Sequence, residues 1–268
     1  MKTDSTIQTL IDKIDSELER LIPKVTYPHN TLYQGAHYAL FSGGKRIRPL
    51  LTLAITDLLN HPIQEALYPA CALELVHTYS LIHDDLPCMD DDDLRRGKPT
   101  LHKVYSEGHA VLVGDFLLTH AFEILAKAPH LGATQKLQLI TILTSAAGGE
   151  GMVGGQVLDL AHDRTTSLED LHAKKTGALF TAALQFGGVI GGASQTIFAN
   201  LTTLGARLGL LFQIIDDILD QENNFSKENV EHHYDGVLEA LEEIPGKKEL
   251  LYALFDKILS QLPLGIIA

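Results

Sequence analysis

The chain has 268 residues, of which 45% are apolar and 21% charged, and its 21 Lys and Arg against 34 Asp and Glu give a net charge of −13. A chain of this size and apolar content can bury one large core, and its 22 Gly and 10 Pro exclude a collagen-like or low-complexity protein. The acidic balance argues against nucleic-acid binding. The two cysteines, Cys71 and Cys88, are too few for a disulfide framework or a cysteine zinc site, and they indicate a reducing compartment.

The N-terminal segment predicts an amphipathic helix. Ile7, Leu10, Ile14 and Leu18 recur every three or four residues, with charged residues between them. The segment carries charge throughout and has no apolar stretch behind a basic start, so we expect no secretion signal and a cytoplasmic location.

The rest of the chain is rich in Ala and Leu and shows no convincing alternation of apolar and polar residues. We predict helices at 50–59, 66–82, 110–125, 136–147 and 168–189, with breaks at 26–30, 60–62, 87, 98–99, 129–132 and 191–192. Some of these helices are apolar on nearly every face, which is typical of the buried layer of a bundle. The sequence therefore predicts a single all-α domain over residues 1–268.

A stretch of 31 residues without a formal charge, 176–206, is long enough to cross a membrane. Several Gln, Asn and Thr residues interrupt this stretch, and the Gly191–Gly192 pair divides it. We therefore expect two buried core helices and no membrane span.

A first acidic cluster lies in the segment 81–97, where six aspartates fall within ten positions. Asp84 and Asp85 end an apolar helix that Pro87 stops, and Asp90 follows six residues after Asp84. A solvated acidic loop is the simpler interpretation of a charge run. Carboxylates clustered at the end of an apolar helix, however, repel one another unless a cation lies between them. Because the available ligands are all oxygen atoms, the cation that this cluster favours is Mg²⁺.

A second acidic cluster places Asp216 and Asp220 four residues apart, with Asp217 between them. The spacing puts Asp216 and Asp220 on one helix face in an apolar stretch, where an unpaired charge is costly. Bound Mg²⁺ that shares ligands with a diphosphate would satisfy both clusters.

Basic residues stand out against this acidic background. Lys45, Arg46 and Arg48 follow Gly43–Gly44, where backbone N–H groups and cations together suit phosphate oxygens. Arg95 and Arg96 follow the first acidic cluster, and Lys175 opens the uncharged stretch. Each could equally be a surface charge, and a lone His77 on the helix of Asp84 is more often a core residue than a ligand.

Glycines at 148–155 interrupt a helical pattern that ends at Asp159. Because glycine inside a helix costs stability unless something packs closely against it, Gln156 and Asp159 could then face a cavity.

Together, the runs GGKRIRP, DDLPCMDDDDLRRG, KTG and DDIL-D make the chain resemble the trans-isoprenyl diphosphate synthases, in particular the short-chain bacterial farnesyl and geranylgeranyl diphosphate synthases. The likeness covers roughly residues 5–220. It implies the isoprenoid synthase fold, a helical bundle around a central active-site cavity, and a homodimer. It also implies Mg-dependent condensation of isopentenyl diphosphate with an allylic diphosphate.

The resemblance also implies a role for each matching residue. Both acidic clusters would hold about three Mg²⁺ on the allylic diphosphate, through Asp84, Asp85, Asp90, Asp216, Asp217 and Asp220. The same diphosphate or its metals would contact Arg95, Lys175, Thr176 and Gln213. Isopentenyl diphosphate would bind at Gly44, Lys45, Arg48, His77 and Arg96.

Product length is expected to depend on Tyr79 and Ser80, which lie five and four residues before Asp84. A large aromatic side chain more than one helical turn below the aspartates obstructs a growing chain. We therefore expect a C15 product, and a C20 product remains the alternative.

After Asp220 the sequence departs from the family. The expected Gly-Lys and Lys-Thr-Thr segment is absent, so the C-terminal part is shortened by about thirty residues, judged against the usual length of the family. This leaves open an inactive or regulatory partner subunit. A helical phosphohydrolase, suggested by His83–Asp84, and a terpene cyclase, whose second motif would need Asn, Ser and Glu, are weaker alternatives.

Overall fold

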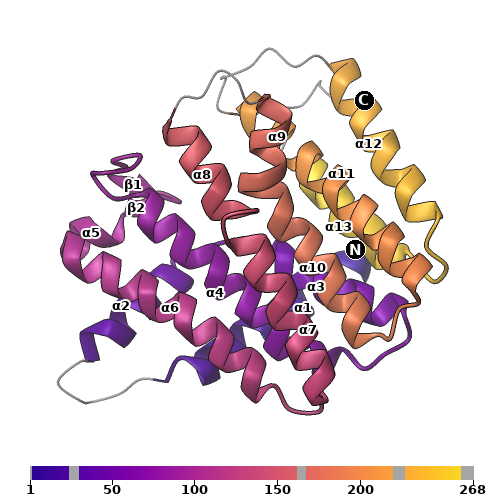
Figure 1. Cartoon of the computed structure of the whole chain (residues 1–268), viewed down its shortest axis with the longest axis horizontal. Helices are drawn as coiled ribbons and strands as arrows, with labels where there is room; N and C mark the ends of the chain where they lie inside the picture. The colour runs from indigo at the N-terminus through magenta and orange to yellow at the C-terminus, as the bar shows by residue number, and fades with distance from the viewer. Residues whose placement is uncertain (1, 24–29, 162–166, 220–226, 261–268) are drawn as a thin grey trace.

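The computed structural model describes residues 2–23, 30–161, 167–219 and 227–260, and these are helical almost throughout (Figure 1). The α-helices are α1 (Lys2–Leu21), α2 (Asn30–Leu40), α3 (Ile47–Leu58), α4 (Leu67–Asp84), α5 (Leu101–Val104), α6 (Glu107–Lys127), α7 (Ala133–Ala147), α8 (Met152–Leu160), α9 (Leu168–His172), α10 (Ala178–Ile190), α11 (Gln195–Leu219), α12 (Lys227–Glu242) and α13 (Glu249–Leu259). A 3₁₀ turn (Ile63–Ala66) precedes α4, and one turn of π-helix (Ala173–Gly177) joins α9 to α10. The all-α prediction is confirmed.

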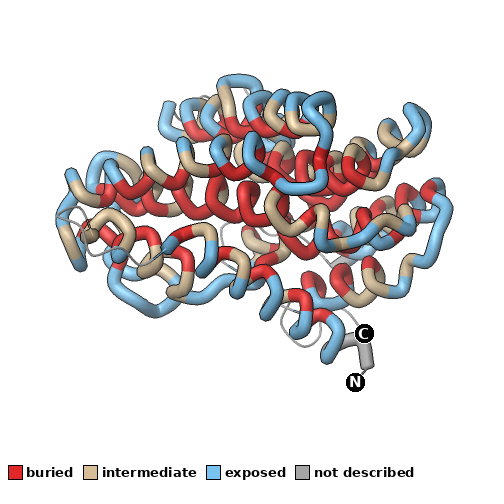
Figure 2. The backbone as a smooth tube through the Cα atoms, turned by 90° about the horizontal axis from the view of Figure 1, so that it is seen from below, coloured by how far each residue is buried: buried red, intermediate tan, exposed pale blue. Residues whose placement is uncertain are grey.

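The core lies along the central helices, where Figure 2 shows buried residues in a continuous layer and exposed residues at the periphery. Helix α4 is the clearest case, since Cys71, Leu73, Leu75 and Val76 are fully buried. Its partners include α3, α6 and α10. Because α4 is surrounded by other helices, it is apolar on nearly every side, as the sequence indicates.

The uncharged stretch forms two helices, α10 and α11, separated by a turn at Gly191–Gly192, as predicted. By length and composition alone, α6 and α11 could each cross a membrane. Both helices pack against other helices of the bundle, α6 on α4 and α11 on α10.

A short hairpin follows the first acidic cluster and was not predicted. Strands β1 (Leu94–Arg95) and β2 (Lys98–Pro99) pair antiparallel, with Arg95 opposite Lys98. The two residues between the strands, Arg96 and Gly97, have φ of 55° and 74°. Two consecutive positive φ values are typical of a type I′ turn, which joins two strands through two residues. Arg95 thus ends β1, whereas the neighbouring Arg96 lies in the turn.

The segments that carry the acidic and basic residues meet at one end of the bundle. In Figure 1 the hairpin, α8 and α9 lie at the upper end of the molecule, close to where α4 ends. The predicted helix at 168–189 runs continuously through the π-turn, which carries Lys175 and Thr176.

Candidate active site

A cavity of about 800 Å³ opens at this end of the bundle, walled by α3, α4, the hairpin, α8, the π-turn and α11. It collects residues that are far apart in the sequence. Twelve of the predicted site residues line it: Gly44, Lys45, Arg48, His77, Tyr79, Ser80, Asp84, Arg95, Arg96, Lys175, Thr176 and Asp216.

Of the other predicted site residues, the described ones that lie outside this lining are Asp85, Asp90, Gln213 and Asp217. Asp85 and Asp217 are buried, at 4% and 3% exposed, and each is bonded to a neighbouring side chain. Asp90 is exposed at the end of the first acidic cluster. Asp220 lies outside the described residues.

The acidic wall of the cavity is built at the end of α4. Burial raises the pKa of Asp84 to about 6, and the nearby carboxylates Asp90 and Asp85 add to the shift against the opposing charges of Lys175 and Arg95. Asp90 is held close because its backbone N–H donates to the carbonyl of Asp84 at 2.9 Å. Asp84 is therefore a partly buried carboxylate with both like and opposite charges around it.

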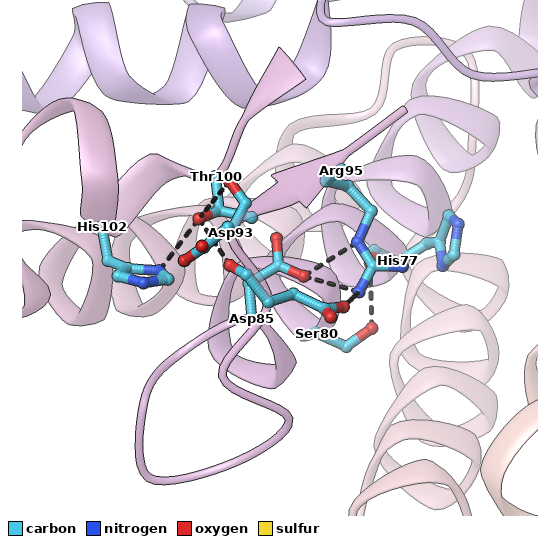
Figure 3. A network of polar contacts seen from close by, with 8 residues as sticks. His77, Ser80, Asp85, Asp93, Arg95, Thr100 and His102 are labelled. Carbon is cyan, nitrogen blue, oxygen red and sulfur yellow. Dashed lines mark hydrogen bonds and ion pairs between the residues drawn. The ribbon is translucent and has the colours of Figure 1, made fainter. Parts of the chain in front are cut away.

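The hairpin directs Arg95 onto this wall, as Figure 3 shows. Its Nε and Nη2 donate to one carboxylate oxygen of Asp85 at 2.8 and 2.6 Å, and Nη2 also donates to Asp92 at 2.8 Å. Burial opposes the charge of Arg95, and the hydrogen bonds and charge of Asp85 outweigh it, so the pKa of Arg95 is raised. Thr100 fixes the far end of the loop by donating to the carbonyl of Asp92 at 2.8 Å.

The second acidic cluster reaches the cavity through Asp216. Burial lowers the pKa of Lys45, and the charge of Asp216 acts in the opposite direction, which places this carboxylate within electrostatic reach of the basic loop. Gln213 donates to Asp217 at 2.8 Å and accepts from the Thr176 hydroxyl at 2.8 Å. Gln213 thus ties α11 to the π-turn.

A basic wall faces the acidic one. Burial lowers the pKa of Arg48 to about 10, with Arg96 among the further causes, and burial also lowers the pKa of Arg96. Burial first, and then the charges of Arg48 and Arg96, hold the pKa of His77 well below its usual value, so its imidazole is neutral at pH 7. Cations that repel one another in this way favour a bound anion.

Backbone conformation shapes the basic loop. Gly43 and Gly44 have φ of 120° and 128°, where side chains are strongly disfavoured. The guanidinium of Arg96 lies against Gly44, 2.7 Å from where a Cβ would be, and its Nη1 donates to the carbonyl of Gly43. The loop and the hairpin therefore form one unit.

Arg46, which the sequence groups with Lys45 and Arg48, turns into the protein instead. It donates to Glu74 at 2.8 Å, to Asp15 at 2.8 Å and to the carbonyl of Leu40 at 2.6 Å. Both Arg46 and Glu74 are nearly fully buried, at 3% and 2% side-chain exposure. Arg46 thus anchors the basic loop to α1 and α4.

Lys175 lies where α8, the π-turn and α11 pack closely. A Cβ at Gly155 would lie 2.4 Å from the backbone nitrogen of Lys175, and a Cβ at Gly209 would lie 2.5 Å from the Cα of Gly177. The Lys175 ammonium pairs with Asp159 at 2.5 Å. Within the glycine-rich run, Gly155 is thereby explained by the close approach of the π-turn backbone.

Among the described residues, three buried side chains have polar atoms without a hydrogen-bond partner, and two of them, Arg48 and Gln156, line the cavity, whereas the third, His102, does not. At the cavity, these atoms are Nε of Arg48 and both amide atoms of Gln156. Arg46 and His83 also line the cavity, and so does Glu74, to which the sequence analysis gave no role. A buried acid on the apolar face of α4 is the signal that could have marked Glu74.

The donor set of the acidic wall suits Mg²⁺. It consists of carboxylate oxygens, the ligands that Mg²⁺ prefers, and the burial that raises the pKa of Asp84 disfavours its negative charge unless a cation is bound beside it. Across the part of the chain that the structure describes, no three His, Cys, Asp or Glu side chains converge as a ready metal site.

Comparisons with known proteins decide the family. The polyprenyl synthetase model matches residues 29–233. The chain belongs to the polyprenyl synthetase family. It is 44% identical over 220 residues to farnesyl diphosphate synthase of Bacillus subtilis, a match that covers 80% of this chain and 74% of that protein.

Other members extend this similarity. A chloroplastic geranylgeranyl pyrophosphate synthase of Catharanthus roseus is 43% identical over 195 residues, which cover 70% of this chain and 55% of that protein. The solved structure of a geranyltransferase from Legionella pneumophila superposes with a TM-score of 0.89 at 36% identity, covering 97% of this chain and 98% of that one. The predicted isoprenoid synthase fold is confirmed, and these matches favour the synthase over the phosphohydrolase and the cyclase.

Proposed function

We propose that this protein is a trans-prenyltransferase that condenses isopentenyl diphosphate with dimethylallyl or geranyl diphosphate and releases farnesyl diphosphate, C15. The observation that carries the proposal is a single cavity with an acidic wall at Asp84 and Asp216 and a basic wall at Lys45, Arg48 and Arg96. Two diphosphates need two such walls. The acidic wall would bind one diphosphate through Mg²⁺ ions, and the basic wall would bind the other directly through its Lys and Arg side chains. The similarity to farnesyl diphosphate synthases supports the product assignment.

The allylic diphosphate belongs at the acidic wall. Bound there, about three Mg²⁺ ions would be held by Asp84, Asp85, Asp90, Asp216, Asp217 and Asp220 and would add positive charge to the leaving diphosphate. Arg95 and Lys175 contribute fixed positive charge at the same wall, and Thr176 and Gln213 supply hydrogen bonds. Neutralising the leaving group allows the allylic C–O bond to ionise.

Isopentenyl diphosphate belongs at the basic wall. Lys45, Arg48 and Arg96 bind its diphosphate, Gly44 lets that group approach the backbone, and the neutral His77 donates a hydrogen bond. The unbonded Nε of Arg48 supports this assignment, because a buried donor without a partner is a costly state that a phosphate oxygen relieves.

The bond forms between the two walls. The double bond of isopentenyl diphosphate attacks the allylic carbocation, and the released diphosphate takes the proton that is lost. The protein contributes proximity and exclusion of water, since Met152, Val157, Leu179 and Phe212 line the space between. Water that entered would convert the carbocation to an alcohol.

The test is a product assay. Purified protein with Mg²⁺, labelled isopentenyl diphosphate and a C5 or C10 allylic diphosphate should yield a C15 diphosphate, and EDTA should abolish it. Asp84→Asn and Asp216→Asn should each lower turnover by about 10³-fold or more, whereas Asp57→Asn, an exposed carboxylate on α3, should not. A C20 product would replace the C15 assignment, and no condensation by a folded protein would favour the inactive-partner alternative.

We also propose that the protein acts as one domain and as a homodimer. A face of α6 and α7 supports the dimer, because Val111, Leu112 and Leu137 are 39%, 59% and 66% exposed on adjacent helices. Large apolar side chains exposed on two neighbouring helices suit an interface between copies.

A cytoplasmic location remains our proposal. Both cysteines, Cys71 and Cys88, are free, which suits a reducing compartment.

A further inference from the structure

A histidine ring lies between two helices directly beside the cavity. Gly114, buried in the middle of α6, faces His83 of α4 so closely that a Cβ there would lie 2.1 Å from Nε2 and 2.5 Å from Cδ2 of the ring. Nε2 also lies 3.2 Å from the carbonyl oxygen of Val111, within reach for donation. Glycine inside a helix costs about 1 kcal/mol relative to alanine, and the close approach of His83 accounts for it.

The other side of this ring contacts Tyr79. The two rings meet edge to face, with centroids 5.7 Å apart and planes at 76°. Tyr79 and His83 are four residues apart and so share one face of α4. Tyr79 is 6% exposed, and both rings reach the cavity wall. The α6 backbone therefore lies behind His83, His83 lies against Tyr79, and both rings line the cavity.

We propose that His83 is a positioning residue that sets product length by holding Tyr79 in place against α6. The inference rests on the proposed function, because it concerns the depth available to a growing prenyl chain. Tyr79 lies on a wall where His83 supports it from the side, and Gly114 provides a side-chain-free surface of α6 against which His83 rests. Removing the His83 ring leaves a ring-sized hollow between α4 and α6, into which Tyr79 can tip, so that the cavity deepens.

The experiment compares product lengths. Wild type, His83→Ala and His83→Phe are each supplied with isopentenyl diphosphate, Mg²⁺ and a C10 allylic diphosphate, and then with a C15 one. We expect His83→Ala to raise the ratio of C20 to C15 product by about tenfold, equivalent to ~1.4 kcal/mol, and to extend the C15 primer. His83→Phe keeps a ring without the Val111 hydrogen bond, so its product distribution should match wild type.

A second pair of variants tests the same contact from α6. Gly114→Ala puts a methyl group where the ring now lies and drives His83 toward Tyr79, so the product should shift toward C10. Gly108→Ala is the matched control, because a Cβ at Gly108 meets nothing within 4 Å. This pair remains informative if His83→Ala does not fold, which circular dichroism would reveal.

Three results would overturn the inference. They are an unchanged C20 to C15 ratio in folded His83→Ala, an equal shift in His83→Phe, or an equal shift in Gly108→Ala and Gly114→Ala. A wild-type protein that makes no prenyl product would instead overturn the proposed function, so the two failures are separable in the same assay.

Discussion

Asp84 illustrates at the scale of one residue how a binding site opposes stability. Burial raises its pKa to about 6, and the neighbouring Asp90 and Asp85 contribute. A carboxyl group whose pKa is higher in the folded than in the unfolded state stabilises the fold while it is protonated. That contribution is complete below the ordinary value of 3.8 and is lost as the pH rises through about 6.

At pH 7.5, Asp84→Asn should therefore stabilise the metal-free protein while it abolishes turnover. The amide keeps the shape of the carboxyl group without its charge, so we expect a gain of ~1–3 kcal/mol, visible as a melting temperature higher by a few degrees. At pH 4 the gain should vanish. Asp57→Asn, on the exposed side of α3, should leave the melting temperature unchanged. A lower melting temperature for Asp84→Asn at pH 7.5 would contradict the assignment of Asp84 as a strained carboxylate.

Mg²⁺ should stabilise the wild-type protein more at pH 7.5 than at pH 5.5. Protons and metal compete for Asp84, whose pKa of about 6 lies between these pH values. Differential scanning fluorimetry with and without about 5–10 mM Mg²⁺ measures the shift in melting temperature that Mg²⁺ causes at each pH. Equal shifts at both pH values would show that the ions bind elsewhere.

Tyr79 and Ser80 are predicted to act on product length in opposite directions when they are changed. Tyr79→Ala removes a ring from the cavity wall and should lengthen the product toward C20. Ser80 also lines the cavity, so Ser80→Phe adds a ring there and should shorten the product toward C10. Chromatography of the dephosphorylated products measures both. If neither variant changes the distribution, product length is set elsewhere in the cavity.

At the scale of elements, the buried pair of Arg46 and Glu74, together with the partly exposed Asp15, joins α1, α4 and the loop before α3. Arg46→Met leaves Glu74 buried without a counter-charge, so unfolding in urea should show a loss of ~3–5 kcal/mol. The double variant Arg46→Met with Glu74→Gln should recover much of it. Arg46→Met should also raise the KM for isopentenyl diphosphate, because Lys45 and Arg48, which are proposed to bind this substrate, flank Arg46 in the sequence.

The matched control for this prediction is Arg20→Met. Arg20 pairs with Glu17 at the surface, with its side chain 59% exposed. Removing a pair of this kind should cost less than ~1 kcal/mol. Equal losses for the two arginines would mean that the buried group contributes no more than a surface ion pair.

Helices with one clear apolar stripe could be predicted from the sequence, because their periodicity records which face is buried. This holds for α1, and the breaks at 60–62, 129–132 and 191–192 follow from Pro and Gly. The π-turn at Ala173–Gly177 could not be predicted, because one extra residue in a single turn changes the periodicity too little to be recognised in a segment of five residues. The hairpin was missed for a related reason, since strands of two residues are too short to show alternation.

Most of the candidate site could also be predicted, because charges that interrupt apolar helices mark positions that face a cavity. The direction of an individual side chain could not. Arg46 and Arg48 are two residues apart in one basic run, yet Arg46 turns toward the buried Glu74 and Arg48 toward the cavity. The positive φ of Arg46, 53°, sends its side chain the other way, and no sequence pattern encodes that angle.

At the scale of the whole molecule, the exposed apolar face of α6 and α7 predicts a dimer that single charges can break. Leu112→Glu and Leu137→Glu should each shift the protein toward monomer in sedimentation experiments, since a charge in an apolar interface costs several kcal/mol. Leu168→Glu is the control, because Leu168 is 47% exposed on α9, outside this face. A wild-type monomer at micromolar concentration would contradict the prediction.

The hairpin also bears on which length variants of this loop can function. Arg95 reaches the acidic wall and Arg96 the basic loop, and this division depends on a two-residue turn in which both φ values are positive. Arg95 ends β1 and Arg96 begins the turn, so inserting or deleting one residue here would change the pairing of the two strands and move both arginines away from the walls they now reach. In a library of single insertions and deletions, we therefore expect active clones to be depleted at 94–99, although many side-chain substitutions at Leu94 and Lys98 should survive.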